Sequence, residues 1–128
     1  MTSTLVIDAN AILRYLLDDH AEHSEQARQV LAQLKTGDLR GLVPEGVLIE
    51  CVYVLLKVYS VPKKEIAEKL RGLLAYRGVL SDHEAVLLES LRLFHEKNVD
   101  IVDAIVHVTA EQRGWRAFSF DKDLQRLR

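Results

Sequence analysis

Short apolar segments alternate with longer amphipathic segments along this 128-residue chain. The short apolar runs are typical of buried strands and cover residues 4–8, 39–43, 79–80 and 115–120. Apolar side chains at helical spacing predict helices over residues 10–17, 22–35, 46–59, 62–76, 81–97, 100–113 and 122–127. Because strands that alternate with helices form parallel sheets covered on both faces, we expect one α/β domain over residues 1–128, with about four or five short strands.

Two helix ends have clear signals in the sequence. Ser81 and Glu84 have the spacing of a capping box, which predicts a helix that begins near residue 81. Gly114 stands just after the helix predicted over residues 100–113, where a glycine commonly ends a helix in left-handed backbone.

The overall charge excludes a strongly basic nucleic-acid-binding chain. The 17 basic and 19 acidic residues leave a net charge of −2, so any RNA partner needs a local basic patch. Two basic stretches are candidates for such a patch, although solvated helix faces explain them equally well: Lys63, Lys64, Lys69, Arg71 and Arg77 form one, and Lys122, Arg126 and Arg128 the other.

The apolar runs and the cysteine content indicate where the protein works. The longest apolar stretch, residues 47–56, is too short for a membrane span and contains Glu50. The single cysteine, Cys51, cannot form an internal disulfide, which fits a reducing compartment. We therefore expect a soluble, cytoplasmic protein with no membrane partner.

Four carboxylates stand within or at the end of apolar segments: Asp8, Glu50, Asp103 and Asp121. A charged side chain among apolar residues is costly unless it is paired, hydrogen-bonded or bound to a metal ion. Asp8 and Asp121 each follow a predicted strand, and the other two lie on predicted helices. Because sites in such folds lie beyond the carboxyl ends of the strands, we expect the four carboxylates to share one site there.

A cluster of carboxylates needs protons or cations, because like charges a few ångströms apart cannot all stay ionised. An all-oxygen set of ligands suits Mg²⁺ or Mn²⁺ rather than zinc. Such an ion lowers the pKa of a bound water and neutralises charge on a phosphoryl group. The four acids therefore point to phosphodiester hydrolysis.

The residues around these acids resemble the motifs of PIN-domain ribonucleases, in the same order and over essentially the whole chain. The similar segments are residues 6–10 around Asp8, 48–55 around Glu50, 100–105 around Asp103 and 119–124 around Asp121. The likeness is greatest to the VapC-type toxins of bacterial and archaeal toxin–antitoxin pairs.

The resemblance implies a PIN-like, Rossmann-like sheet and an endoribonuclease that depends on Mg²⁺, with Mn²⁺ able to substitute. It also implies a homodimer, and a cognate antitoxin protein that inserts a segment into the active-site groove. The metal ligands and catalytic residues would be Asp8, Glu50, Asp103 and Asp121. Asn10 would hydrogen-bond around Asp8, Ser119 would orient Asp121 or a metal-bound water, and Asp100 and Asp123 would lie close to the ligands.

Each of the four acids also has an ordinary structural explanation. Asp8 suits the N-cap of the helix that follows it, and Asp121 suits a turn or an N-cap. Asp103 could share an exposed helix face with His107. Glu50 is the hardest to explain in this way, because its predicted helix has few other polar positions.

Four further side chains have a functional and a structural reading. Arg14 could reach a substrate phosphate, although a solvated helix face explains it more simply. His107 follows Asp103 at the spacing of a zinc-binding pair, but no second His or Cys accompanies it, which favours a structural histidine. We expect Trp115 and Phe118 to pack in the sheet rather than to stack on bases.

Two other functions compete with the ribonuclease hypothesis. A non-catalytic PIN-fold module could act only by binding protein or RNA. A phosphatase or phosphotransferase could use Asp8 as a covalent nucleophile, but such phosphatases generally have a second Asp two positions later, where this chain has Asn10. The binding module is the stronger competitor.

Overall fold

This computed structural model describes residues 3–17 and 21–127, apart from the side chains of residues 21–23 and 123. The elements in chain order are β1 (Leu5–Val6), α1 (Ala9–Leu17), α2 (Ala21–Thr36), β2 (Gly41–Leu42), α3 (Glu45–Tyr53), the π-helical turn η1 (Val54–Val58), α4 (Lys63–Leu74), β3 (Val79–Leu80), α5 (Glu84–Glu96), α6 (Ile101–Arg113) and α7 (Lys122–Arg126). No helix in the described ranges is long and apolar enough to cross a membrane.

The strands form a parallel sheet in the order β1-β2-β3, which confirms the predicted α/β class. Leu5 of β1 lies opposite Gly41 of β2, and the Ile7 amide donates a hydrogen bond to the Leu42 carbonyl at 2.9 Å. Because the strands are parallel, their carboxyl ends share one edge of the sheet. Asp8 follows β1 at this edge, as predicted.

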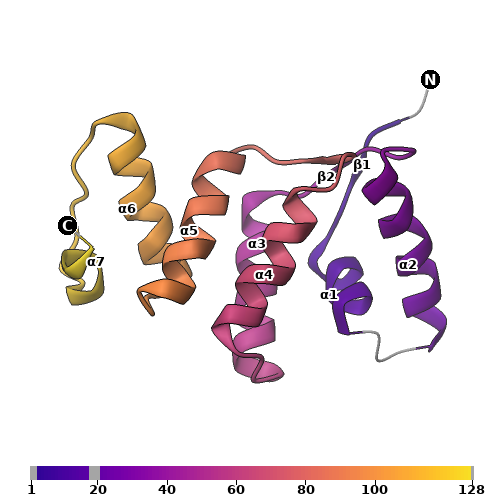
Figure 1. The fold of residues 1–128 in the computed structure, drawn as a ribbon, viewed down its shortest axis with the longest axis horizontal. Coiled ribbons are helices and arrows are strands. Elements are labelled where there is room, and N and C mark those ends of the chain that lie inside the picture. Colours follow the sequence, from indigo (N-terminus) through magenta and orange to yellow (C-terminus); the bar gives the residue numbers. More distant parts are fainter. Residues whose placement is uncertain (1–2, 18–20, 128) are drawn as a thin grey trace.

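The strand predicted over residues 115–120 is wrong. These residues, all of them described, run as irregular chain between α6 and α7, so the described sheet has three strands rather than four or five. Trp115, Phe118 and Phe120 are 63%, 87% and 88% exposed, which contradicts the expected packing of Trp115 and Phe118 in the sheet. The physical reason is the position of α6, which packs along α5 and carries the following chain away from β1 (Figure 1).

Most helix bounds agree with the sequence, and one capping prediction is wrong. Gly114 ends α6 with a φ of 69°, in the left-handed backbone expected of it. The capping box does not form, because α5 begins only at Glu84, with His83 as N-cap and no side-chain cap bond. The buried Ser81 hydroxyl has no hydrogen-bond partner among the described residues.

The core has two parts that differ in size and position. The larger holds the sheet against α1, α3, α4 and α5 through side chains such as Leu48, Leu70 and Leu91. The smaller joins α5 to α6 and consists of Leu93, Val99, Ala104 and Val108. In Figure 1, α5, α6 and α7 accordingly follow one another in a row, with α7 at the end of the molecule opposite to α2.

Candidate acidic site

Asp8 caps the helix that follows β1. Its Oδ1 atom accepts a hydrogen bond from the Ala11 amide at 3.1 Å, and the side chain is exposed. This bond satisfies one of the free amides at the start of α1, which is the ordinary role predicted for Asp8. It also fixes the carboxylate at the carboxyl edge of the sheet, where it can still face a ligand.

Glu50 lies on α3, directly before the buried Cys51. The Cys51 thiol donates to the Ala9 carbonyl at 4.0 Å and so joins α3 to the start of α1. Burial first of all, then the negative charges of Glu50 and Asp8, together raise the pKa of this thiol to about 12. Asp8 and Glu50 therefore lie close enough to the same thiol to act on it electrostatically.

Asp100 and Asp103 lie at the start of α6, near Tyr53 on α3. Asp100 is the N-cap of α6, and its Oδ2 atom accepts from the Val102 amide at 3.0 Å. The Tyr53 hydroxyl donates to both Asp100 oxygens at 3.0 Å. Burial first of all, then the hydrogen bond to Asp100 and the charges of Asp100 and Asp103, together raise the pKa of Tyr53 to about 12.

The contact between Tyr53 and Asp100 is the functional feature that the sequence interpretation missed. Tyr53 has no predicted role in the sequence beyond its place in the helix expected over residues 46–59. Its spacing of three residues from Glu50 places both on neighbouring positions of one helix surface, which was the available signal. Tyr53 thereby links the Glu50 region of α3 to the acids of α6.

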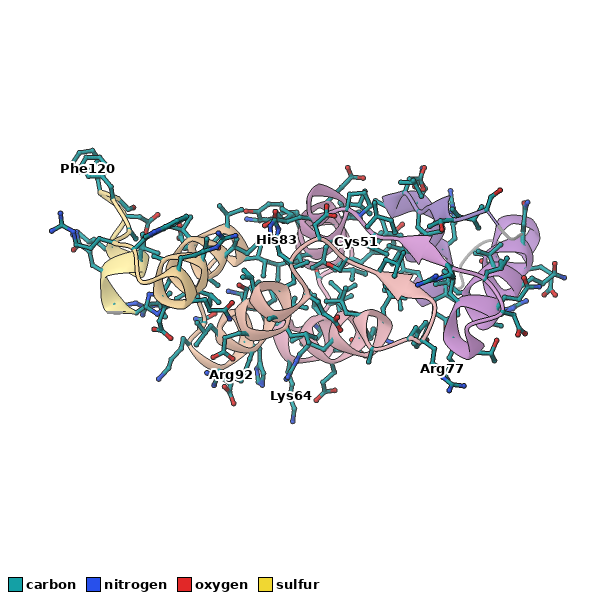
Figure 2. The ribbon with its side chains drawn as sticks, turned by 90° about the horizontal axis from the view of Figure 1, so that it is seen from above. Cys51, Lys64, Arg77, His83, Arg92 and Phe120 are labelled. Carbon is teal, nitrogen blue, oxygen red and sulfur yellow. The ribbon has the colours of Figure 1, made fainter. Side chains whose placement is uncertain are left out.

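Asp121 precedes α7, whereas Asp8 and Glu50 lie near Cys51. The Asp121 amide donates a hydrogen bond to the Ser119 hydroxyl at 2.9 Å. The Arg126 guanidinium of α7 donates to the carbonyls of Lys97 and Asn98, at 3.4 and 3.5 Å, which holds α7 at the α5–α6 end. Figure 2 shows the neighbouring Phe120 at that end of the molecule, well separated from Cys51.

The residues that were expected to support the four acids lie in different parts of the structure. Asn10 and Arg14 line a shallow hollow of about 410 Å³ between α1 and α2, together with Gln26 and Val30. The hydrogen bond to Asp8 comes from the Ala11 amide, not from the predicted Asn10. The Ser119 hydroxyl accepts a hydrogen bond from the Asp121 amide, and the side chain of Asp123 lies outside the described residues.

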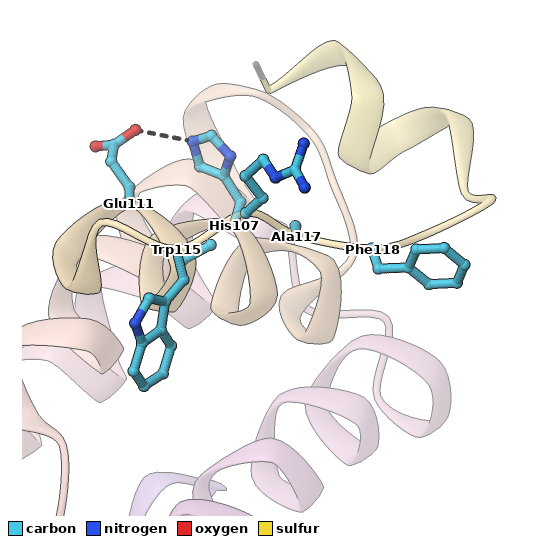
Figure 3. Close-up of a pocket in the computed structure, with 7 residues that line it drawn as sticks. His107, Glu111, Trp115, Ala117 and Phe118 are labelled. Carbon is cyan, nitrogen blue, oxygen red and sulfur yellow. Dashed lines mark ion pairs between the residues drawn. The ribbon is translucent and has the colours of Figure 1, made fainter.

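His107 takes part in a separate hollow at the far end of α6. Its Nε2 atom lies 3.2 Å from Glu111, one turn later, so it pairs with a carboxylate other than Asp103. A hollow of about 670 Å³ opens beside this pair, and Figure 3 shows it bordered by Trp115, Ala117 and Phe118. The pair with Glu111 is the contact expected of a structural histidine.

The acids have the chemistry that a divalent metal ion requires. Asp8, Glu50 and Asp103 supply only oxygen ligands, the set that Mg²⁺ and Mn²⁺ prefer. Among the described residues, no three His, Cys, Asp or Glu side chains converge closely enough to hold a metal ion. Asp8, Glu50 and Asp121 are exposed, so the cost of burying a charge does not by itself require a cation.

The comparison with protein families agrees with the fold. The family model of the PIN domain matches residues 5–128. No curated protein matches the chain. Since the family match covers nearly the whole sequence, the chain belongs to the PIN-domain family.

Proposed function

We propose that this protein is a metal-dependent endoribonuclease that hydrolyses RNA phosphodiesters. PIN domains are generally nucleases, so the family supports hydrolase activity. The observation that supports the proposal most directly is electrostatic: Asp8 and Glu50 both act on Cys51 of α3, and Asp103 acts on Tyr53 of the same helix. The carboxylates would bind Mg²⁺ or Mn²⁺, which supplies an activated water and neutralises charge on the phosphoryl group.

The side chains of this protein have distinct roles in the proposed reaction. The N-cap bond holds Asp8 in one orientation before an ion or RNA arrives, and the bonds from Tyr53 hold Asp100 beside Asp103. Such preorganisation avoids the cost of ordering the carboxylates during the reaction. Glu50 is an exposed residue of α3, next to Cys51, and would complete the set of ligands.

The test is cleavage of total RNA and of a single-stranded RNA with Mg²⁺ or Mn²⁺, with EDTA as the metal-free reference. We expect cleavage that EDTA abolishes and that Glu50→Gln lowers at least about 100-fold, the usual loss of an electrostatic catalytic group. Glu68→Gln is the matched control, because Glu68 is an exposed glutamate on α4. Equal cleavage by wild type and Glu50→Gln would overturn the proposal.

We also propose that the protein is the toxin of a type II toxin–antitoxin pair. The support is the resemblance of its motif order and length to VapC-type toxins. A cognate antitoxin would bind the groove beside the acids and block RNA. Co-expression with the product of the neighbouring small open reading frame should give a stable complex that does not cut RNA, whereas separate purification of the two would contradict this role.

A binding module without catalysis is the second candidate, and the absence of three converging ligands among the described residues favours it. The two candidates differ in their response to Mn²⁺. Ligand binding to the native state raises apparent stability, so a catalytic site should raise Tm at millimolar Mn²⁺. An unchanged Tm together with uncut RNA would favour the binding module.

A further inference from the structure

The hollow between α1 and α2 is built from two helices that are joined to each other. The helices lie side by side in Figure 1. Ser24 of α2 is fully buried, and its hydroxyl donates to the Arg14 carbonyl of α1 at 3.4 Å. The volume of about 410 Å³ lies within the range of about 300 to 1,000 Å³ that is typical of small-molecule sites.

The floor of this hollow is apolar. Ala27 of α2 is buried, and Ala11 and Val30 are partly buried against the hydrophobic core. Two of these three residues are alanines, which leave the space above them open. A flat aromatic ring can lie on such a floor, because apolar side chains pack against the faces of nucleobases.

The rim of the hollow is polar. Asn10 and Gln26 are exposed, and the carboxamide of each offers a carbonyl oxygen as acceptor and an amino group as donor. Arg14 adds a planar guanidinium, a group that binds phosphate oxygens. Among the described residues, those that line the hollow include this cation and no carboxylate, so the lining suits an anionic ligand.

Ala11 connects the hollow to the acidic site. Its amide donates to Asp8 Oδ1 at 3.1 Å, and the same residue lines the hollow. A ligand in the hollow therefore lies next to one of the proposed metal ligands. An RNA strand bound at the acids can place one base in the hollow and a phosphate beside Arg14.

We propose that this hollow binds one unpaired base of an RNA strand and selects adenine. As a site for RNA, it rests on the proposed function. The amino group of adenine has a ring nitrogen acceptor on each side, so a carboxamide can form two hydrogen bonds at either edge. Asn10 and Gln26 supply two carboxamides to the same hollow. Cytosine has only one such edge, and the corresponding edge of guanine has two acceptors and no donor.

Binding without cleavage tests the selection. Fluorescence anisotropy in EDTA compares short single-stranded homopolymers of A, U and C. We expect the A homopolymer to bind at least about fivefold more tightly than the other two, the discrimination of one good pair of hydrogen bonds. Gln26→Leu removes one carboxamide at similar size and should remove most of this preference.

Gln33→Leu is the matched control for Gln26→Leu. Gln33 is an exposed glutamine of the same helix and is not among the residues that line the hollow. This variant should keep the preference for the A homopolymer. Equal dissociation constants of the wild type for the three RNAs would overturn the adenine site, as would a preference that persists in both Gln26→Leu and Asn10→Leu.

Arg14 has a separate role in this site, and its substitution distinguishes phosphate binding from base selection. Phosphate contacts carry no sequence information, so Arg14→Ala should weaken binding of all three RNAs by a similar factor and reduce the dependence on salt. Loss of the base preference at unchanged overall affinity would contradict this role.

Nuclear magnetic resonance locates the bound base independently of any variant. Titration with adenosine monophosphate should shift the side-chain amide signals of Asn10 and Gln26 and the backbone signals of Ala11 and Ala27. Uridine monophosphate at the same concentration should shift them less. Shifts confined to other parts of the chain would overturn the site.

The adenine site and the proposed nuclease activity can fail separately. Protein that prefers the A homopolymer but cuts no RNA would refute the nuclease and keep the adenine site. Protein that cuts RNA without preference for adenine, and binds the three homopolymers equally, would refute the adenine site and keep the nuclease. An antitoxin complex weakened by Gln26→Leu, without any base preference, would assign the hollow to a protein segment instead.

Discussion

The Tyr53 hydroxyl donates to both carboxylate oxygens of Asp100, at 3.0 Å each. Asp100 also caps α6 through the Val102 amide, so one carboxylate ties α3 to the first turn of α6. This connection sets where Asp103 lies relative to Glu50. It therefore joins the stability of α6 to the geometry of the acidic site.

Removing the Tyr53 hydroxyl tests this connection. We expect Tyr53→Phe to lower the free energy of unfolding by about 1 to 2 kcal/mol, because a partly buried hydrogen bond to a charged group is lost. Urea unfolding measures the change. Tyr59→Phe is the control, since Tyr59 is exposed and its hydroxyl lies outside this contact. Equal stability of the two variants would mean that the bond to Asp100 contributes nothing.

The substitution Asp8→Asn separates the helix-capping role of Asp8 from its proposed role in RNA cleavage. Asparagine caps a helix about as well as aspartate, so the Tm should change little. The loss of the negative charge should lower RNA cleavage at least about 100-fold. Thermal unfolding and an initial-rate assay under the same metal concentration measure the two effects. A large drop in Tm would show that the charge of Asp8 is needed for the fold itself.

The buried thiol of Cys51 gives a defined dependence on pH. Its pKa is raised from the ordinary 9.0 to about 12, so the native state keeps its proton over a range in which the unfolded chain loses it. The stability that the protonated thiol contributes is complete below pH 9 and is lost as the pH rises towards 12. The free energies of unfolding of wild type and Cys51→Ala, plotted against pH, should converge across this range. Parallel plots would contradict the raised pKa.

Thiol chemistry provides a second check on the same residue. A thiol with a pKa of about 12 forms almost no thiolate near neutral pH, so native protein should resist alkylation. Protein unfolded in urea should react with one equivalent of reagent, because Cys51 is the single cysteine. Rapid reaction of the native protein would place Cys51 outside the core.

Two glycines with different surroundings give a matched pair of stability tests. A Cβ at Gly78 would lie 2.0 Å from the Leu39 carbonyl oxygen, a backbone atom that cannot move alone. A Cβ at Gly72 on α4 would meet nothing within 4 Å. We expect Gly78→Ala to destabilise the protein by about 2 kcal/mol or more and Gly72→Ala to stabilise it by up to about 1 kcal/mol. Chemical denaturation of both variants measures the difference.

The sequence predicted correctly those elements whose local side-chain pattern matches the structure that their neighbours in the fold allow. The helices that become α2 and α4 have apolar side chains on one face and clear ends, and the structure has them within a few residues of the predicted bounds. Residues 115–120 also have a strand pattern, but a strand needs a neighbour. The local sequence could not report that α6 packs along α5 and leaves this segment remote from β1.

The same distinction holds for the acids. The order of residues predicted that Asp8 follows a strand and that Asp103 lies near the start of a helix, because both depend on local signals. The bond between Tyr53 and Asp100 joins residues far apart in the chain, and no spacing rule predicts it. The convergence of all four acids was an inference from the sheet topology, and it required a strand over residues 115–120, which the described sheet does not contain.

The parallel register of the sheet also constrains how the chain folds. Two helical segments separate β1 from β2, and two more lie between β2 and β3, so each strand pair closes a long loop. The entropy lost on closing such loops makes their pairing slow. The helices should therefore form and collapse before the strands meet. Hydrogen exchange of the Ile7 and Val43 amides, which bond across the sheet, should then require complete unfolding, whereas the amides of α7 should exchange by local opening.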